Sequence, residues 1–273
     1  MIEAIWLFLR RLRAFVIRDY RLAVSYRVDF VMRILSVLIM VISFYFVSRL
    51  LVGQVNSAFP EWENPFLTWL TGFPFLSYFL TGFSSLANAI REEQKQGTLE
   101  SVLITPINIP TLIVCSSAWD LVQVTITSFC YFFFGWIFFD AHFKGSFLLA
   151  ILFLVVTTMV LGCLGILSAS FAMVFKRGDP FAILLGTGSA LFSGVLFPTQ
   201  LLGKEFGVVS KFLPTTYGLD GIRRVLIMNE SLYQVREPLV VLLALLALLL
   251  PLSLWIFGRA VTKAKRDGSL IQF

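Results

Sequence analysis

Few residues in this sequence could carry out catalysis or bind a metal, and their spacing argues against both. The single histidine, His142, stands in a short segment between two apolar runs, where a solvent-exposed loop position is expected. Cys115, Cys130 and Cys163 each lie inside an apolar run and lack the close spacing of zinc ligands. A Ser-His-Asp set would have to use that one histidine. We therefore expect no catalytic residues, no metal ligands and no enzyme activity.

The sequence also lacks a phosphate-binding loop. Gly203-Lys204 is its one Gly-Lys pair, and Pro198 occupies the position five residues before Gly203, where a Walker A loop has glycine. Gly186-Thr187-Gly188 lies inside an apolar run and not after a strand, which excludes a dinucleotide-binding turn. If ATP drives this protein, we expect its binding site on another chain.

The composition indicates an integral membrane protein. Hydrophobic residues make up 58% of the 273 residues and charged residues only 14%, whereas a soluble domain carries about 25% charged residues. A water-soluble core has no room for so much apolar surface. The net charge of +6 comes from cations that flank apolar runs. These cations therefore indicate contact with lipid headgroups, and we expect no nucleic acid partner.

Six apolar runs are long enough to cross about 30 Å of hydrocarbon, which takes about 20 helical residues. They are residues 31–52, 64–90, 111–139, 147–175, 180–203 and 238–258. The sequence therefore predicts an all-α membrane protein with six transmembrane helices and both termini on one side. Lys and Arg are more numerous on that side, so we expect cytoplasmic termini in the inner (plasma) membrane.

The N-terminal segment, residues 1–29, is expected to form a helix in the membrane interface. Ile5, Trp6 and Leu9 share one helical face, whereas Arg10 and Arg18 lie away from it. This pattern is typical of an amphipathic helix with its apolar side among the headgroups. An ordinary anchor beside the first span would show the same pattern. Residues 259–273 are expected to form a cytoplasmic tail.

A dense group of charged residues joins the second and third expected spans, at residues 91–106. It contains Glu92 and Glu93, followed by Leu99, Val102 and Leu103 at helical spacing. This pattern fits either a short amphipathic helix along the membrane surface or a solvated loop.

This segment resembles the Glu-x-x-x-Gly-Thr-Leu-Glu…Thr-Pro signature of the type-2 ABC exporter permeases. The matching positions are Glu93, Gly97, Thr98, Leu99 and Glu100. The resemblance implies that residues 91–105 form a coupling helix, seated in a cleft of a cytoplasmic ATPase.

A second resemblance to the same family follows the fifth expected span. Residues 193–198 and 213–224 are similar to its Ser-Gly-x-x-Phe-Pro and Leu-Pro-x-Thr-Tyr-x-x-(acidic)-x-x-Arg patterns. The matching positions include Pro198, Pro214, Tyr217, Asp220 and Arg223. This resemblance implies that residues 200–217 form short re-entrant helices in the outer leaflet, within a six-span domain over residues 30–258.

The resemblance also implies the partners of the chain. Two ATPase subunits would supply ATP and Mg²⁺, and a second copy or a homologue would complete a dimeric channel in contact with membrane lipids. In the family the first and fifth spans line the subunit interface. Ala182, Gly186, Ala190 and Gly194 form a stripe of small residues on the fifth span, which suits either that interface or packing within the chain.

Polar residues of the third expected span share one helical face: Ser116, Asp120, Gln123 and Thr127. An aspartate at the bilayer centre costs about 2.5–3.5 kcal/mol on insertion scales. We therefore expect Asp120 and Gln123 to face other helices or the interface. Packing or a hydrogen bond explains them better than contact with substrate.

These features predict a permease that exports a hydrophobic or amphipathic, drug-like or lipid-like substrate from the cytoplasm or the inner leaflet. Export of a lipid-linked polysaccharide is the alternative within transport. A membrane-embedded enzyme or a scaffold without transport is the alternative of another class, and the lack of paired catalytic or metal-binding residues argues against the enzyme.

Overall fold

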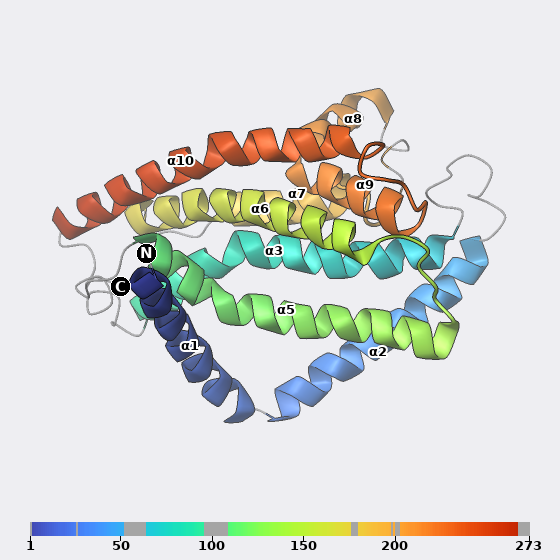
Figure 1. Ribbon diagram of the computed structural model, residues 1–273, viewed down its shortest axis with the longest axis horizontal. Coiled ribbons are helices and arrows are strands. Elements are labelled where there is room, and N and C mark those ends of the chain that lie inside the picture. Colours follow the sequence, from blue (N-terminus) through green and yellow to red (C-terminus); the bar gives the residue numbers. More distant parts are fainter. Residues whose placement is uncertain are drawn as a thin grey trace.

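The computed structural model describes residues 2–25, 27–51, 64–95, 109–175, 180–197, 199 and 203–266. Within these ranges the chain forms nine helices and no strands (Figure 1). The helices are α1 Ile2–Ser25, α2 Arg27–Leu51, α3 Pro65–Lys95, α5 Ile109–Phe139, α6 Phe147–Phe175, α7 Pro180–Phe192, α8 Gly203–Phe212, α9 Pro214–Leu226 and α10 Arg236–Arg266.

Five of the described helices are long and apolar enough to cross a membrane: α2, α3, α5, α6 and α10. Each corresponds to one of the expected runs, with ends that differ by a few residues. Helices α10, α6, α3 and α5 pack side by side in that order (Figure 1). The chain is therefore a multi-pass, all-helical membrane protein.

The remaining expected span, residues 180–203, differs from the prediction because it does not form one long helix. Helix α7 has 13 residues, about 20 Å at 1.5 Å per residue, whereas the hydrocarbon core is about 30 Å thick. Gly194, just beyond its end, has a φ of +85°, a left-handed conformation that commonly terminates helices. Bends continue the chain through Phe197, so the apolar run is divided into a short helix and an irregular segment.

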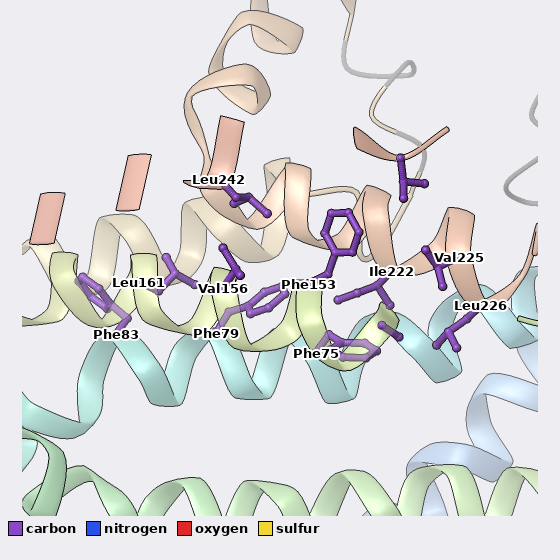
Figure 2. Close-up of a cluster of buried hydrophobic side chains, with 12 residues drawn as sticks. Phe75, Phe79, Phe83, Phe153, Val156, Leu161, Ile222, Val225, Leu226 and Leu242 are labelled. Atoms are coloured by element: carbon purple, nitrogen blue, oxygen red, sulfur yellow. The ribbon is translucent and has the colours of Figure 1, made fainter. Parts of the chain in front are cut away.

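The main core lies between α3, α6, α9 and α10. Figure 2 shows how aromatic side chains of α3 face α6 and α9. Its buried members are Phe75, Phe79, Phe83, Ala150, Phe153, Val156, Leu161, Ile222, Val225, Leu226, Val235 and Leu242. Helix α9 therefore packs inside the domain instead of lying on its surface.

Two glycines allow α9 to approach α6 this closely. A Cβ atom at Gly221 would overlap the ring of Phe153, and one at Gly218 would overlap the side chain of Thr157. Phe153 and Thr157 are themselves fully buried. The contact thus depends on the absence of two side chains from one face of α9.

Basic and aromatic residues pair at both ends of α10. The Arg236 guanidinium lies 4.4 Å from the ring centroid of Tyr233, and the Arg259 guanidinium lies 3.9 Å from that of Trp255. Such pairs are typical of residues at headgroup level. They place the two ends of α10 at opposite membrane surfaces.

The expected N-terminal helix is present as α1, which packs against α5 and α2. The expected re-entrant segment, residues 200–217, corresponds to α8 and the start of α9. Helix α9 continues to Leu226, so this helical segment is longer than the sequence indicated.

Candidate functional site

A cavity of about 430 Å³ lies between α1, α2 and α5. Its lining is polar where α2 and α5 enter the bundle and apolar further along both helices. The lining residues are Tyr20, Asp29, Phe30, Val31, Arg33, Ile34, Val37, Trp119, Gln123, Ile126, Thr127 and Cys130. Of the polar residues that we expected inside the membrane, Gln123 and Thr127 line this cavity.

Arg33 connects the two helices at the polar end of the cavity. Its Nη1 donates a 2.8 Å hydrogen bond to Oε1 of Gln123, and its Nη2 lies 3.3 Å from Oδ2 of Asp29. The side chains of Arg33 and Asp29 are 42% and 70% exposed. An arginine near the end of a membrane span often extends towards lipid headgroups, whereas the side chain of Arg33 is bonded to α5. In the sequence, the four-residue spacing of Asp29 and Arg33 could have indicated that these two side chains pair on one face of a helix.

Asp120 is half-buried on α5, one turn before Gln123. It lies within electrostatic range of Asp19 on α1 and Arg33 on α2. Nearby, Tyr20 of α1 contacts Trp119 of α5 edge to face, with ring centroids 5.9 Å apart. Asp120 therefore faces other helices, at the junction of α1, α2 and α5. The sequence did not identify Tyr20 or Trp119 as site residues.

A second polar site lies at the opposite end of the bundle, around Arg223 of α9. Arg223 is 3% exposed. Its Nη1 donates a 2.7 Å hydrogen bond to the carbonyl oxygen of Gly194, and its Nη2 donates a 3.2 Å bond to that of Thr68 in α3. Trp69 of α3 donates from Nε1 to the carbonyl oxygen of Leu196 at 3.2 Å. The bent segment after α7 is thus bonded to both α3 and α9.

The residue after Arg223 belongs to a separate charge network near the surface. Arg224 lies 2.7 Å from a carboxylate oxygen of Glu230 and 3.7 Å from one of Asp220. Burial alone would lower the pKa of the Arg224 guanidinium, but its hydrogen bond to Glu230 and the charge of Asp220 raise this pKa above its ordinary value. Arg224 therefore remains protonated at physiological pH, and the network should not respond to pH through this residue.

Two further residues of the expected re-entrant motif contribute to local structure. Pro214 is buried at the first turn of α9, where a missing N–H costs no hydrogen bond. The Tyr217 hydroxyl donates to the carbonyl oxygen of Lys211 at 2.9 Å, which joins α9 to α8. Pro198 lies outside the described residues.

Two members of the small-residue stripe, Gly186 and Ala190 of α7, lie beside α3 of the same chain. A Cβ atom at Gly186 would lie 3.6 Å from Leu80 of α3. Ala190 packs beside Leu76 and Val195, and Gly194 is buried. The side chain of Ala182 lies outside the described part of the structure.

The expected coupling segment is described only at its start. Glu92 and Glu93 belong to the last turns of α3, where the structure describes the helix but not the side chains. Gly97, Thr98, Leu99 and Glu100 lie outside the described residues. Among the residues that the structure does describe, no cluster of His, Cys, Asp and Glu could hold a metal ion.

These observations define the class of the molecule, a helical membrane protein that crosses the bilayer several times. The family model of the ABC-2 type transporter matches residues 10–227, which is most of the chain. The chain therefore belongs to the ABC-2 type transporter family, as a membrane permease and thus a transport subunit. Permeases of this family generally pair with ABC ATPase subunits. No curated protein matches the sequence.

Proposed function

We propose that this chain is the permease subunit of an ATP-driven exporter. It moves a hydrophobic or amphipathic, drug-like or lipid-like molecule out of the cytoplasm or the inner leaflet. Two copies, or one copy and a homologue, assemble with two cytoplasmic ATPase subunits that bind ATP and Mg²⁺. Both termini lie in the cytoplasm and the complex resides in the inner (plasma) membrane. Family membership over residues 10–227 supports this proposal.

The observation that carries the proposal is the length and burial of α3. This helix has 31 residues, about 46 Å at 1.5 Å per residue, whereas its apolar part is Pro65–Asn88. The last turns, up to Lys95, therefore extend beyond the hydrocarbon. Helix α3 is the most buried of the five long spans and contacts α2, α5, α6, α7 and α9. A force applied at its charged end would reach most of the bundle.

Coupling to ATP hydrolysis is assigned to residues 91–105 at that end of α3. Glu92, Glu93, Gly97, Thr98, Leu99 and Glu100 would contact a cleft of the ATPase. Partly desolvated carboxylates in such a cleft can contribute strongly, because truncating one partner of a buried charged pair typically costs about 2–5 kcal/mol.

Six crossings, and thus termini on one side, require α7 to traverse the membrane with the bent segment that follows it. Gly186 of α7 lies beside Leu80, and Leu196 lies beside Trp69, so this stretch runs antiparallel to α3. Gly145, between α5 and α6, donates from its backbone N–H to the carbonyl oxygen of Leu226 at 3.2 Å. The end of α9 and the α5–α6 connection therefore share one side, which supports a crossing by α7.

We propose that the second copy of the permease contacts this chain through α7. The stripe of Ala182, Gly186, Ala190 and Gly194 remains the proposed interface helix surface. Gly186 and Ala190 lie beside α3, so the partner helix would approach the open face of α7 next to them. Thr187 and Leu191 are exposed on that face, and within the described part of the chain no other helix lies within 4 Å of a Cβ added at Gly188.

The test is a permease with Glu93→Ala and Glu100→Ala, isolated from its native membrane with a tag. We expect normal membrane insertion, because surface carboxylates contribute little to stability, but loss of the copurifying ATPase or of its substrate-stimulated ATP hydrolysis. Glu237→Ala, at the opposite end of the bundle, is the matched control. Retention of the ATPase with wild-type stimulation in the double variant would contradict the proposed coupling.

A further inference from the structure

We infer that the cavity between α1, α2 and α5 binds one phospholipid of the leaflet that contains α1. Its headgroup is zwitterionic with a primary ammonium, as in phosphatidylethanolamine, and one of its acyl chains fills the apolar part. This site is distinct from the transport activity proposed above. Phospholipid binding at this site needs no ATPase, so a negative result for the lipid would not contradict the proposed transport function.

The polarity of the cavity follows the depth of its lining residues. Asp29 and Arg33 lie in the first turns of α2, and Gln123 lies at the corresponding level of α5. Val37 of α2 lies one turn beyond Arg33 and two turns beyond Asp29, and Cys130 of α5 lies two turns beyond Gln123, about 6–12 Å at 1.5 Å per residue. A ligand that fits both parts has a polar head and a hydrocarbon tail.

The charges at the mouth favour a head that carries both signs. The bond to Gln123 holds the Arg33 guanidinium at the cavity, where its exposed side can meet a phosphate. Asp29 is 70% exposed, so its carboxylate can accept hydrogen bonds from an ammonium group. Asp120 adds a second carboxylate near Arg33. A purely anionic head would offer neither carboxylate a cationic partner and would add repulsion at the mouth.

The apolar part is open to the bilayer at its side and closed at its far end. Ile126, one turn beyond Gln123, is 41% exposed, so an acyl chain can enter laterally there. Phe30 and Val31, which lie beside Asp29 at the polar end, are 50% and 60% exposed. Beyond Val37, the fully buried Val41 belongs to the cluster that joins α2 to α3 and α5. Because this cluster closes the cavity, the site retains a resident lipid and does not form part of a path across the membrane.

The hydroxyl of Thr127 does not disturb this apolar lining. Its Oγ1 donates to the carbonyl oxygen of Gln123 in the same helix at 2.9 Å. The hydroxyl is therefore satisfied within α5 and makes no demand on the acyl chain. The structure thus provides an acyl-chain site beneath a matched pair of charges.

The experiment uses the full chain in lipid nanodiscs that contain phosphatidylethanolamine with a photoactivatable acyl chain. After irradiation, mass spectrometry should locate the label on residues 29–37 of α2 and 119–130 of α5. Ile126→Trp should fill the cavity and lower this labelling about tenfold, equivalent to 1.4 kcal/mol. Ile39→Trp is the matched control, because Ile39 is 56% exposed on the same helix as Arg33 but does not line the cavity. Its labelling should equal that of wild type.

The headgroup assignment is tested with Asp29→Asn and Arg33→Gln, and with a phosphatidylglycerol probe of the same acyl chain. Wild type should label more strongly with phosphatidylethanolamine, and Asp29→Asn should remove this preference. Equal labelling by both probes, or wild-type labelling of Ile126→Trp, would overturn the proposal. Native mass spectrometry of the chain purified from cells should show one bound phospholipid. A bound amphiphile of another class would identify the cavity as a substrate site and also overturn it.

Discussion

Arg223 of α9 donates a 2.7 Å hydrogen bond to the carbonyl oxygen of Gly194, at the residue where α7 gives way to the bent segment. The same guanidinium reaches the carbonyl oxygen of Thr68 in α3. A broken helix leaves carbonyl groups without intrahelical partners, and inside a membrane such groups are costly. Arg223 supplies a donor to one of them and links α9 to α3 and to the bent segment after α7.

Replacing Arg223 with lysine should destabilise the permease, because one ammonium group cannot reach both carbonyl oxygens. A hydrogen bond to a charged group contributes about 1.5–3 kcal/mol. The melting temperature in detergent can be followed with a thiol-reactive dye, since Cys115 and Cys163 are 1% and 3% exposed and react on unfolding. Arg236→Lys, on an exposed arginine, should melt like wild type. An unchanged melting temperature for Arg223→Lys would contradict this role.

Adding a side chain to Gly221 should loosen the contact between α9 and α6. A valine there would overlap the ring of Phe153, and overpacking of a filled core typically costs about 1–3 kcal/mol. The same thermal assay should show a lower melting temperature for Gly221→Val. Gly258→Ala is the matched control, because a Cβ atom at Gly258 meets no other segment among the described residues within 4 Å. Equal melting of the two variants would show that α9 is not held by this contact.

The five long spans could be predicted from sequence because each is an uninterrupted apolar run of sufficient length. The division of the remaining run, residues 180–203, could not be predicted, since its apolar character continues past the end of α7. The break depends on Gly194 in a left-handed conformation and on a donor 29 residues away. The motif that contains Ser193 to Pro198 marked this place in the sequence, but not the contact with Arg223.

The cavity between α1, α2 and α5 could likewise be predicted only in part from the sequence. The residue spacing predicted that Asp120 and Gln123 face other helices or the interface. Arg33, the hydrogen-bond partner of Gln123, lies 90 residues earlier in the sequence. An arginine near the end of a span is most simply expected to extend to the headgroups. The packing of α2 against α5 determines the position of the Arg33 side chain, and this packing cannot be predicted from the sequence of either helix alone.

A bulky residue at Gly188 should weaken assembly of two permease copies without affecting the fold. At Gly188 an added Cβ meets no other described segment of the chain within 4 Å, so Gly188→Leu should be accommodated within one copy. Gly186→Leu is the contrasting variant, because it meets Leu80 and should lower the melting temperature of the monomer. Cysteine crosslinking at Thr187 should form dimers in wild type and fewer in Gly188→Leu. Unaltered crosslinking in Gly188→Leu would place the second copy elsewhere.

The direction of α7 decides which side of the membrane carries the end of α9 and the C-terminal tail. If α7 crosses, Tyr233 lies outside together with the α5–α6 connection that includes His142. If it does not, Tyr233 and His142 lie on opposite sides, which conflicts with the hydrogen bond between Gly145 and Leu226. We therefore predict that Tyr233→Cys, in a chain whose native cysteines are replaced, reacts with an impermeant maleimide on intact cells.

The controls for this labelling follow from the same topology. Tyr233 is 73% exposed, so a lack of reaction cannot result from burial within the chain. His142→Cys and Ser57→Cys should also react from outside, whereas Gln94→Cys should react only after the membrane is made permeable. External reaction at position 94, or reaction at position 142 without reaction at 233, would contradict six crossings. The second result would in addition show that α7 turns back within the bilayer, because α6 and α10 would then be joined on the cytoplasmic side.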